Sequence, residues 1–216
     1  MLDFTVVLEN MPSLLRGMWM TTWISLLSIA IGFFIGVVLC LGRMSTKRSI
    51  CNICAFYISC LRGTPLLVQL VIVFYFLPLI GIQIPSIAAA IIALSMNTAA
   101  FQAEILRGGF QVLPKGQREA AWTFGINGWQ RLRYIELPQV FRQTLPSLVN
   151  ETIDIVKNSA LISTIAVTDL MRIAQTYSST TYRPIEFFVT AGLLYLILTS
   201  CIGVAGRYIE SRLEIH

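Results

Sequence analysis

Polar side chains recur at helical spacing inside two apolar stretches of this sequence. Asn97, Phe101 and Glu104 are separated by four and three positions, and Glu151, Asp154 and Asn158 by three and four. Each set therefore lies near one face of a helix. Amide and carboxyl groups in apolar surroundings are costly without a partner, so they are candidates for contact with a polar solute. The six residues that we predict to line a substrate path are Asn97, Phe101, Glu104, Glu151, Asp154 and Asn158.

Some of these residues also have a purely structural interpretation. Asp154 precedes Lys157 by three positions, and the two side chains can form an ion pair within one helix. Asn97 can instead hydrogen-bond across a contact between two helices, which is a common use of Asn in membranes. Both alternatives stay open on sequence alone.

The sequence contains no constellation for catalysis or metal binding. It has no G-x-x-x-x-G-K-[ST] phosphate loop, so we expect any ATP hydrolysis to reside in a separate chain. Its one histidine is His216, so no serine or cysteine has an imidazole base nearby in sequence, and the pair Cys51 and Cys54 lacks further ligands. We therefore predict no enzyme, no metal and no cofactor.

The composition indicates a membrane protein. Of 216 residues, 56% are hydrophobic and 12% are charged, whereas soluble domains carry about 25% charged residues. The net charge is +5, but the basic residues fall in short clusters between apolar runs, which argues against nucleic-acid binding. We predict one all-α domain over residues 1–216, a polytopic membrane helical bundle with five transmembrane helices at about 17–42, 64–80, 86–106, 144–165 and 187–206.

Two segments of this predicted bundle are unusual. Residues 50–61 are apolar but too close to the second span to extend it as one straight helix, so we expect a separate short helix with a bend at Gly63 and Pro65. The fourth span carries Glu151, Asp154 and Lys157, which must face protein or a wet cavity rather than lipid.

Basic residues set the predicted orientation in the membrane. Eleven basic residues flank the spans on one side of the membrane and three flank them on the other. The positive-inside rule makes the side with eleven cytoplasmic. The N-terminus is then outside, the C-terminus is cytoplasmic, and the loop between spans three and four faces the cytoplasm. The eleven are Arg43, Lys47, Arg48, Arg107, Lys115, Arg118, Arg131, Arg133, Arg142, Arg207 and Arg212, and the three are Arg16, Arg172 and Arg183.

That loop, about residues 114–138, contains the stretch EAAWTFGINGWQRLRYIELP from Glu119 to Pro138. Its first part can form two helical turns that stop at Gly125, and a second short helix can follow until Pro138 ends it. We expect a compact two-helix hairpin with exposed arginines and buried aromatic residues.

The same stretch carries a family resemblance. Seven positions, Glu119-Ala120-Ala121, Gly125, Ile135 and Leu137-Pro138 with their spacing, resemble the EAA loop in the membrane subunits of ATP-binding-cassette (ABC) importers. In that family the loop is the coupling helix, which seats in a groove of the cytoplasmic ATPase and transmits its closure to the membrane. The resemblance implies that Glu119, Ala120, Ala121 and Gly125 are the ATPase-coupling residues.

The resemblance covers essentially the whole chain and is closest to the polar amino-acid uptake branch. It implies an ATPase dimer, a periplasmic or extracellular amino-acid-binding protein and a second copy or paralogous permease as partners, in a bacterial inner membrane. The chain departs from many relatives by having Asn158 where they carry Asp, which leaves the charge of the substrate open. The further matching motifs are Arg62-Gly63-Thr64-Pro65-Leu66 with Gln69, and Asn97-Thr98-Ala99-Ala100 followed by Glu104 and Arg107-Gly108.

Two rival functions remain at this level, and the contact made by one stripe of small residues is also open. An ion-coupled secondary carrier would work without an ATPase, and a membrane scaffold would transport nothing. Ser25, Ser28, Gly32 and Gly36 form a stripe of small residues on the first span, which permits close contact with a second copy or faces lipid.

Overall fold

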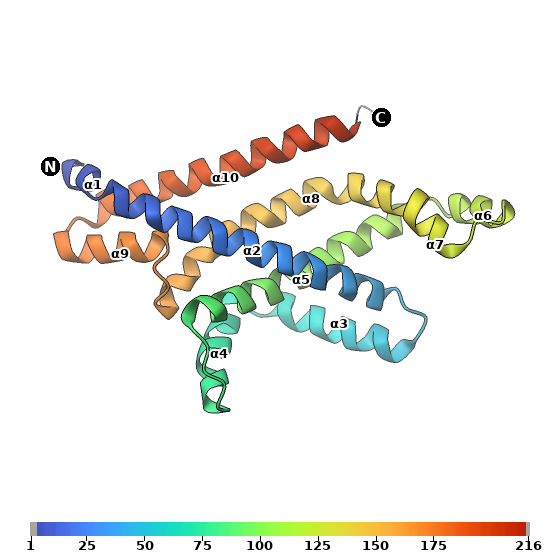
Figure 1. Cartoon of the computed structure of the whole chain (residues 1–216), viewed down its shortest axis with the longest axis horizontal. Helices are drawn as coiled ribbons and strands as arrows, with labels where there is room; N and C mark the ends of the chain where they lie inside the picture. Colours follow the sequence, from blue (N-terminus) through green and yellow to red (C-terminus); the bar gives the residue numbers. More distant parts are fainter. Residues whose placement is uncertain (1–3, 215–216) are drawn as a thin grey trace.

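The computed structural model describes residues 4–214, and the chain ends, including His216, lie outside this part. Every regular element in the described part is a helix, as predicted from the apolar runs (Figure 1). The main helices are α1 (Thr5–Glu9), α2 (Met11–Arg43), α3 (Arg48–Gly63), α4 (Leu66–Leu79), α5 (Ser86–Val112), α6 (Lys115–Thr123), α7 (Gly128–Gln130), α8 (Leu137–Asn158), α9 (Leu170–Thr181) and α10 (Pro184–Glu214). A π-helical segment, Arg131–Glu136, precedes α8 and a 3-10 segment, Ser159–Ile165, follows it.

Three of the described helices, α2, α5 and α10, are long and apolar enough to cross a membrane, and the count becomes four if α3 and α4 cross as one broken span. The interval predicted as the second span corresponds to α4, whose 14 residues reach only about 21 Å. That length is short of a bilayer core of about 30 Å. The predicted number of five spans therefore stays a prediction.

The predicted bend near Gly63 and Pro65 is confirmed. The axes of α3 and α4 differ by 106°, and α4 projects sideways from the bundle (Figure 1). Thr64 and Pro65 between them are extended, with ψ values of 145° and 136°. The cause is Pro65, which disfavours helical backbone at the residue before it and lacks the N–H that would continue the ladder.

The centre of the bundle is the contact between α2 and α5, which lie side by side (Figure 1). Ser28, Gly32 and Gly36 of α2 are buried in this contact. A Cβ atom on Gly36 would lie 3.1 Å from the carbonyl oxygen of Ala99 and 3.3 Å from the nitrogen of Ala103. The stripe of small residues thus packs against α5 of the same chain, and the two expected partners, a second copy and lipid, are both wrong for it.

We expect Gly36→Val to lower the free energy of unfolding by about 2 kcal/mol, because the new side chain meets backbone atoms that cannot move aside. Thermal unfolding of the detergent-solubilised chain measures this. The control is Ala30→Val, because Ala30 is exposed on the same helix. Equal stability of the two variants would contradict a tight α2–α5 contact.

The end of the bundle near the N-terminus is held by polar contacts between α2 and α9. The Asp169 side chain caps α9 by accepting hydrogen bonds from the backbone N–H groups of Arg172 at 2.9 Å and Met171 at 3.3 Å. The backbone N–H of Leu170 donates to Thr21 Oγ1 at 3.1 Å. Burial raises the pKa of Asp169 to about 6, and the hydrogen bonds from the backbone oppose this rise.

Candidate functional site

A cavity of about 320 Å³ lies where the break between α3 and α4 meets α5 and α8. Five of the six predicted path residues line it, although they come from two helices separated by some 50 positions in sequence. Glu104 is the exception. The full lining is Thr64, Pro65, Leu66, Leu67, Asn97, Phe101, Glu151, Asp154, Ile155, Asn158 and Leu161.

Asn97 holds one wall of this cavity in place. Its amide Nδ2 donates to Gln69 Oε1 at 3.0 Å. The Gln69 Nε2 in turn donates to the carbonyl oxygens of Leu61 at 2.7 Å and Thr64 at 3.0 Å. These carbonyls lie at the end of α3, where a helix leaves its last acceptors without internal partners. Asn97 therefore makes the interhelical hydrogen bond of the structural alternative and also lines the cavity, so its contact with substrate stays a prediction.

Gln69 was not among the predicted path residues, although it stabilises the bend that shapes the cavity. Its signal in the sequence is a single amide in the apolar run of α4, Leu66–Leu79. The resemblance named Gln69 only as part of a motif. Its role can be recognised only in the folded structure, which shows the carbonyl oxygens that the bend leaves without helical partners.

Glu151 is the most deeply placed acid of the cavity, with only 8% of its surface exposed. Its Oε1 accepts a hydrogen bond from Thr98 Oγ1 at 2.9 Å, and that hydroxyl accepts one from Gln102 Nε2 at 3.0 Å. Within residues 4–214, no Lys or Arg forms an ion pair with Glu151. A buried carboxyl group without a cation can bind a positively charged ligand group.

Asp154 and Lys157 form an ion pair of 2.7 Å on α8, and both side chains are more than half exposed. The predicted internal ion pair is therefore confirmed. Asp154 also lines the cavity, together with the exposed Asn158 at the end of α8. An exposed ion pair of this kind contributes little to stability, so Asp154 is free to exchange Lys157 for another cation.

Glu104 lies two helical turns from Asn97 and belongs to a different cluster. It binds Arg107 through two hydrogen bonds, of 2.6 and 2.9 Å, and lies 3.9 Å from both Arg43 and Arg62. Its carboxylate is thus engaged by protein cations. The Arg62 guanidinium also lies 5.1 Å from the ring centre of Phe101, so this cluster borders the cavity without opening into it.

The predicted hairpin between α5 and α8 is present at one end of the bundle (Figure 1). We call residues 114–136 the coupling loop. Gly125 ends α6 with φ +70°, a conformation that favours glycine. Asn127 and Gln130 then form a capping box at the start of α7. The helix does not end at Pro138 as predicted, because Pro138 occupies the first turn of α8, where a missing N–H is tolerated.

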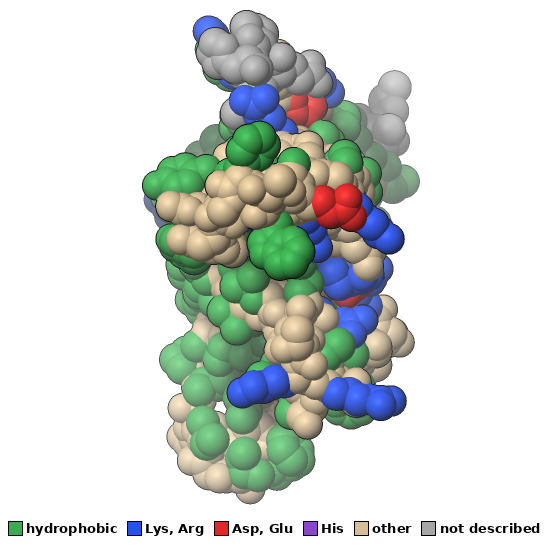
Figure 2. Space-filling view, turned by 90° about the vertical axis from the view of Figure 1, so that its right-hand side faces the viewer, with side chains coloured by type: hydrophobic (Ala, Val, Ile, Leu, Met, Phe, Trp, Pro, Cys, Tyr) green, Lys and Arg blue, Asp and Glu red, His purple; other side chains and the backbone are tan. Residues whose placement is uncertain are grey.

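The aromatic residues of the coupling loop are exposed, which corrects the prediction that they are buried. Their exposed fractions range from 69% to 84% for Trp122, Phe124, Trp129 and Tyr134. Figure 2, which views this end of the molecule, shows hydrophobic side chains on the outer surface among Lys and Arg side chains. Large exposed aromatic groups are typical anchors of a protein interface.

Ion pairs hold the coupling loop together, and hydrogen bonds fasten it to the bundle. Glu136 is 5% exposed and lies 2.9 Å from Arg118 and 3.1 Å from Arg131. The side-chain amides of Gln117 and Gln139 pair with each other at 3.0 Å and so join α6 to α8. These contacts connect the coupling loop to α8, which carries Glu151 and Asp154.

The four predicted coupling residues divide into two groups. Glu119, Ala120 and Gly125 lie on the exposed surface of the loop. Ala121 is 3% exposed and packs inward. We infer that Ala121 supports the loop and that the other three are available to a partner.

A bundle of long apolar helices with a polar cavity and an exposed loop at one end fits the membrane subunit of a transporter. A model of the family "Binding-protein-dependent transport system inner membrane component" matches residues 28–215, and the chain belongs to this family. It is thus a multi-pass permease subunit of an ABC importer, as the EAA loop indicated, and neither a stand-alone carrier nor a scaffold. ATP hydrolysis resides in a separate subunit.

Individual relatives match over the whole chain. The arginine transport system permease protein ArtQ of Bacillus subtilis is 39% identical over 214 residues, which cover 99% of this chain and 98% of ArtQ. The glutamine transport system permease protein GlnP of Escherichia coli K12 is 32% identical over 215 residues, with coverage of 99% and 98%.

Solved structures agree. The crystal structure of an amino acid ABC transporter with histidines superposes with a TM-score of 0.92 at 35% identity, over 98% of this chain and 99% of that chain. An inward-facing MetNI methionine ABC transporter shares the fold, with a TM-score of 0.80 at 24% identity and coverage of 95% and 98%.

Proposed function

We propose that this permease subunit imports a polar amino acid through the cavity between α4, α5 and α8. The observation that carries the proposal is the cavity itself, which brings together Asn97, Glu151, Asp154 and Asn158. A zwitterionic amino acid needs an anion for its ammonium group and hydrogen-bond donors for its carboxylate. Glu151 or Asp154 supplies the first, and the amides of Asn97 and Asn158 supply the second. Relatives named for arginine and glutamine support this substrate class.

The charge of the cavity narrows the choice of substrate. Glu151 and Asp154 face it, Lys157 is paired with Asp154 at 2.7 Å, and Arg62, which borders the cavity beside Phe101, lies 3.9 Å from Glu104. The site therefore favours neutral or cationic amino acids over anionic ones. Many relatives carry Asp at the position of Asn158, so this cavity has one carboxylate fewer and its preference for cationic substrates is moderate.

The proposed assembly follows from the two ends of the bundle. The coupling loop and its basic surroundings face the cytoplasm and bind a dimeric ATPase, and the end with α1 and α9 faces outward toward an amino-acid-binding protein. The permease pairs with a second copy or a paralogous subunit. The N-terminus is then outside and the C-terminus cytoplasmic, in the bacterial inner membrane.

Reconstitution with the ATPase and binding protein in proteoliposomes tests this function. We expect arginine or glutamine to stimulate ATP hydrolysis at least about fivefold more than glutamate, which corresponds to about 1 kcal/mol of charge discrimination. Stimulation by glutamate alone would contradict the proposed cavity chemistry. Uptake by the isolated chain under an ion gradient would contradict the coupling to an ATPase.

A further inference from the structure

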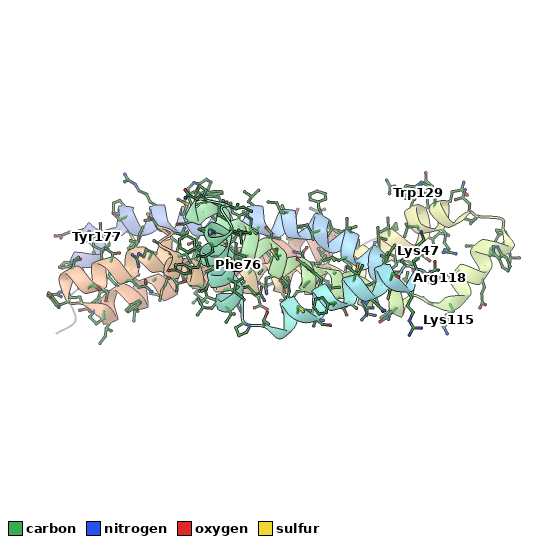
Figure 3. The ribbon with its side chains drawn as sticks, turned by 90° about the horizontal axis from the view of Figure 1, so that it is seen from below. Lys47, Phe76, Lys115, Arg118, Trp129 and Tyr177 are labelled. Carbon is green, nitrogen blue, oxygen red and sulfur yellow. The ribbon has the colours of Figure 1, made fainter. Side chains whose placement is uncertain are left out.

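A second cavity, of about 360 Å³, lies at the end of the bundle that carries the coupling loop. We call it the basic pocket. Four of its eight lining residues are cations from three different helices: Arg43 of α2, Arg107 of α5, and Lys115 and Arg118 of α6. Figure 3 places Lys115 and Arg118 at this end, opposite the end marked by Tyr177.

The charge around the basic pocket is only partly neutralised. Of the four lining cations, Arg43 and Arg107 share Glu104, and Arg118 pairs with Glu136. Each of these two carboxylates is also engaged by one arginine outside the lining, Arg62 and Arg131 respectively. Lys115 forms no ion pair within residues 4–214. A concave surface with such an excess of one sign concentrates ions of the opposite sign.

The start of α6 adds to this positive potential. The helix begins at Lys115, and Pro114 before it provides no side-chain cap. The backbone N–H of Gln117 donates to the carbonyl oxygen of Pro114 at 3.1 Å, whereas those of Lys115 and Gly116 receive no side-chain cap, and the positive end of the helix dipole lies beside the pocket. The pocket thus combines two independent features that favour an anion.

An apolar groove of about 250 Å³ adjoins the basic pocket, because Phe110 lines both. Its lining residues all lack charge and hydrogen-bonding side chains other than one thiol and one indole, and they come from α2, α5, the coupling loop and α8. Representative members are Val37, Leu41, Leu106, Trp129, Leu132 and Phe141. A small soluble anion does not bind to an apolar groove, whereas a hydrocarbon chain fits it.

We propose that the basic pocket and the adjoining groove form a binding site for one anionic phospholipid. The phosphate of its headgroup lies among Arg43, Arg107 and Lys115, and an acyl chain occupies the groove. The lipid then contacts both the bundle, through α2 and α5, and the coupling loop, through Lys115 and Trp129. The bound lipid stabilises the position of the coupling loop relative to the helical bundle.

Native mass spectrometry of the full-length permease in nonionic detergent tests this site, with phosphatidylglycerol, phosphatidylcholine and inorganic phosphate as separate probes. We expect phosphatidylglycerol to bind at least about tenfold more tightly than phosphatidylcholine. The double variant Arg43→Gln, Lys115→Gln should weaken this binding about thirtyfold, since each cation near an anionic headgroup contributes a factor of about five. Lys115→Gln alone, at an exposed position, should weaken it about fivefold.

Matched controls separate this site from general attraction to a basic surface. Lys47 lies at the same end of the molecule (Figure 3) but does not line the pocket, so Lys47→Gln should change binding less than about twofold. For the groove, Leu41→Gln should weaken binding several-fold, and Val38→Gln, at an exposed position of the same helix outside the groove, should not.

Several outcomes would overturn the proposal. Equal binding of the two lipids, or equal losses for Lys47→Gln and Lys115→Gln, would mean that no specific site exists. Binding of inorganic phosphate with no effect of Leu41→Gln on lipid would assign the pocket to a soluble phosphate compound. Complete loss of lipid upon addition of the ATPase would assign the surface to that protein.

Discussion

Reversing the charge of Glu119 is expected to abolish retention of the ATPase while the permease still inserts in the membrane. Glu119 is exposed on α6, beside the exposed Ala120, and forms no ion pair in the described chain. Glu119→Arg therefore removes nothing that holds the permease together. Placing a cation in an interface that selects an anion costs roughly 2–4 kcal/mol, or a factor of about 30 to 1,000 in affinity. Co-purification of the ATPase with tagged permease measures the loss.

A matched charge reversal distinguishes this effect from a general change of the surface. Arg142 is exposed on α8 outside the coupling loop, so Arg142→Glu should retain the ATPase. Gly125→Asp provides an independent change, because its φ of +70° places a side chain in strained backbone while no atom lies within 4 Å to clash with it. Normal ATPase retention by both Glu119→Arg and Gly125→Asp would remove the coupling role of this loop.

The second large effect is expected at Glu151. Glu151→Gln keeps the volume of the side chain and an oxygen that can accept the hydrogen bond from Thr98, but it removes the charge that binds the substrate's ammonium group. In a buried site this loss is worth about 3 kcal/mol, so the KM for uptake should rise about hundredfold. Uptake by proteoliposomes of the full transporter measures this. The ATPase should stay bound, unlike in Glu119→Arg.

Two further carboxylates serve as comparisons for Glu151. Asp154→Asn should raise KM only about threefold, because Asp154 is more than half exposed and already paired with Lys157. Glu9→Gln, at an exposed position near the opposite end of the chain, should have no effect. A wild-type KM for Glu151→Gln would show that Glu151 only accepts the hydrogen bond from Thr98.

The structure divides the predicted path residues between the cavity and a separate ion-pair cluster, which spacing alone did not predict. Asn97 and Glu104 lie on one helical face, so a face-based argument treats them alike. In the folded chain, Glu104 meets arginines from α2, α3 and α5. The distances between those helices are a property of the tertiary structure. The shared helical face correctly predicted which side of α5 lines the cavity. It did not predict how far along α5 the cavity extends.

The exposure of the loop aromatics was missed for a related reason. Trp122 and Phe124 are apolar, and the usual expectation is that a compact hairpin buries such residues. The hairpin is too small to form a core of its own, and its buried contact is the carboxylate of Glu136 with the partly exposed Arg118 and Arg131. The apolar side chains are left for a partner. Only the arrangement of these charges in three dimensions reveals that.

The sequence by itself determined the class of protein, because long apolar runs, clustered basic residues and the Glu119 to Pro138 motif are each local properties of the chain. The positions of most helices followed from the same local information, including the break that Pro65 forces, but the start of α8 at Leu137 and the helix α9 did not. The tertiary structure alone decided which polar residues meet in the cavity, that the small residues of α2 pack on α5, and that cations gather in a pocket beside an apolar groove. These features depend on contacts between segments far apart in sequence, and neither composition nor periodicity records such contacts.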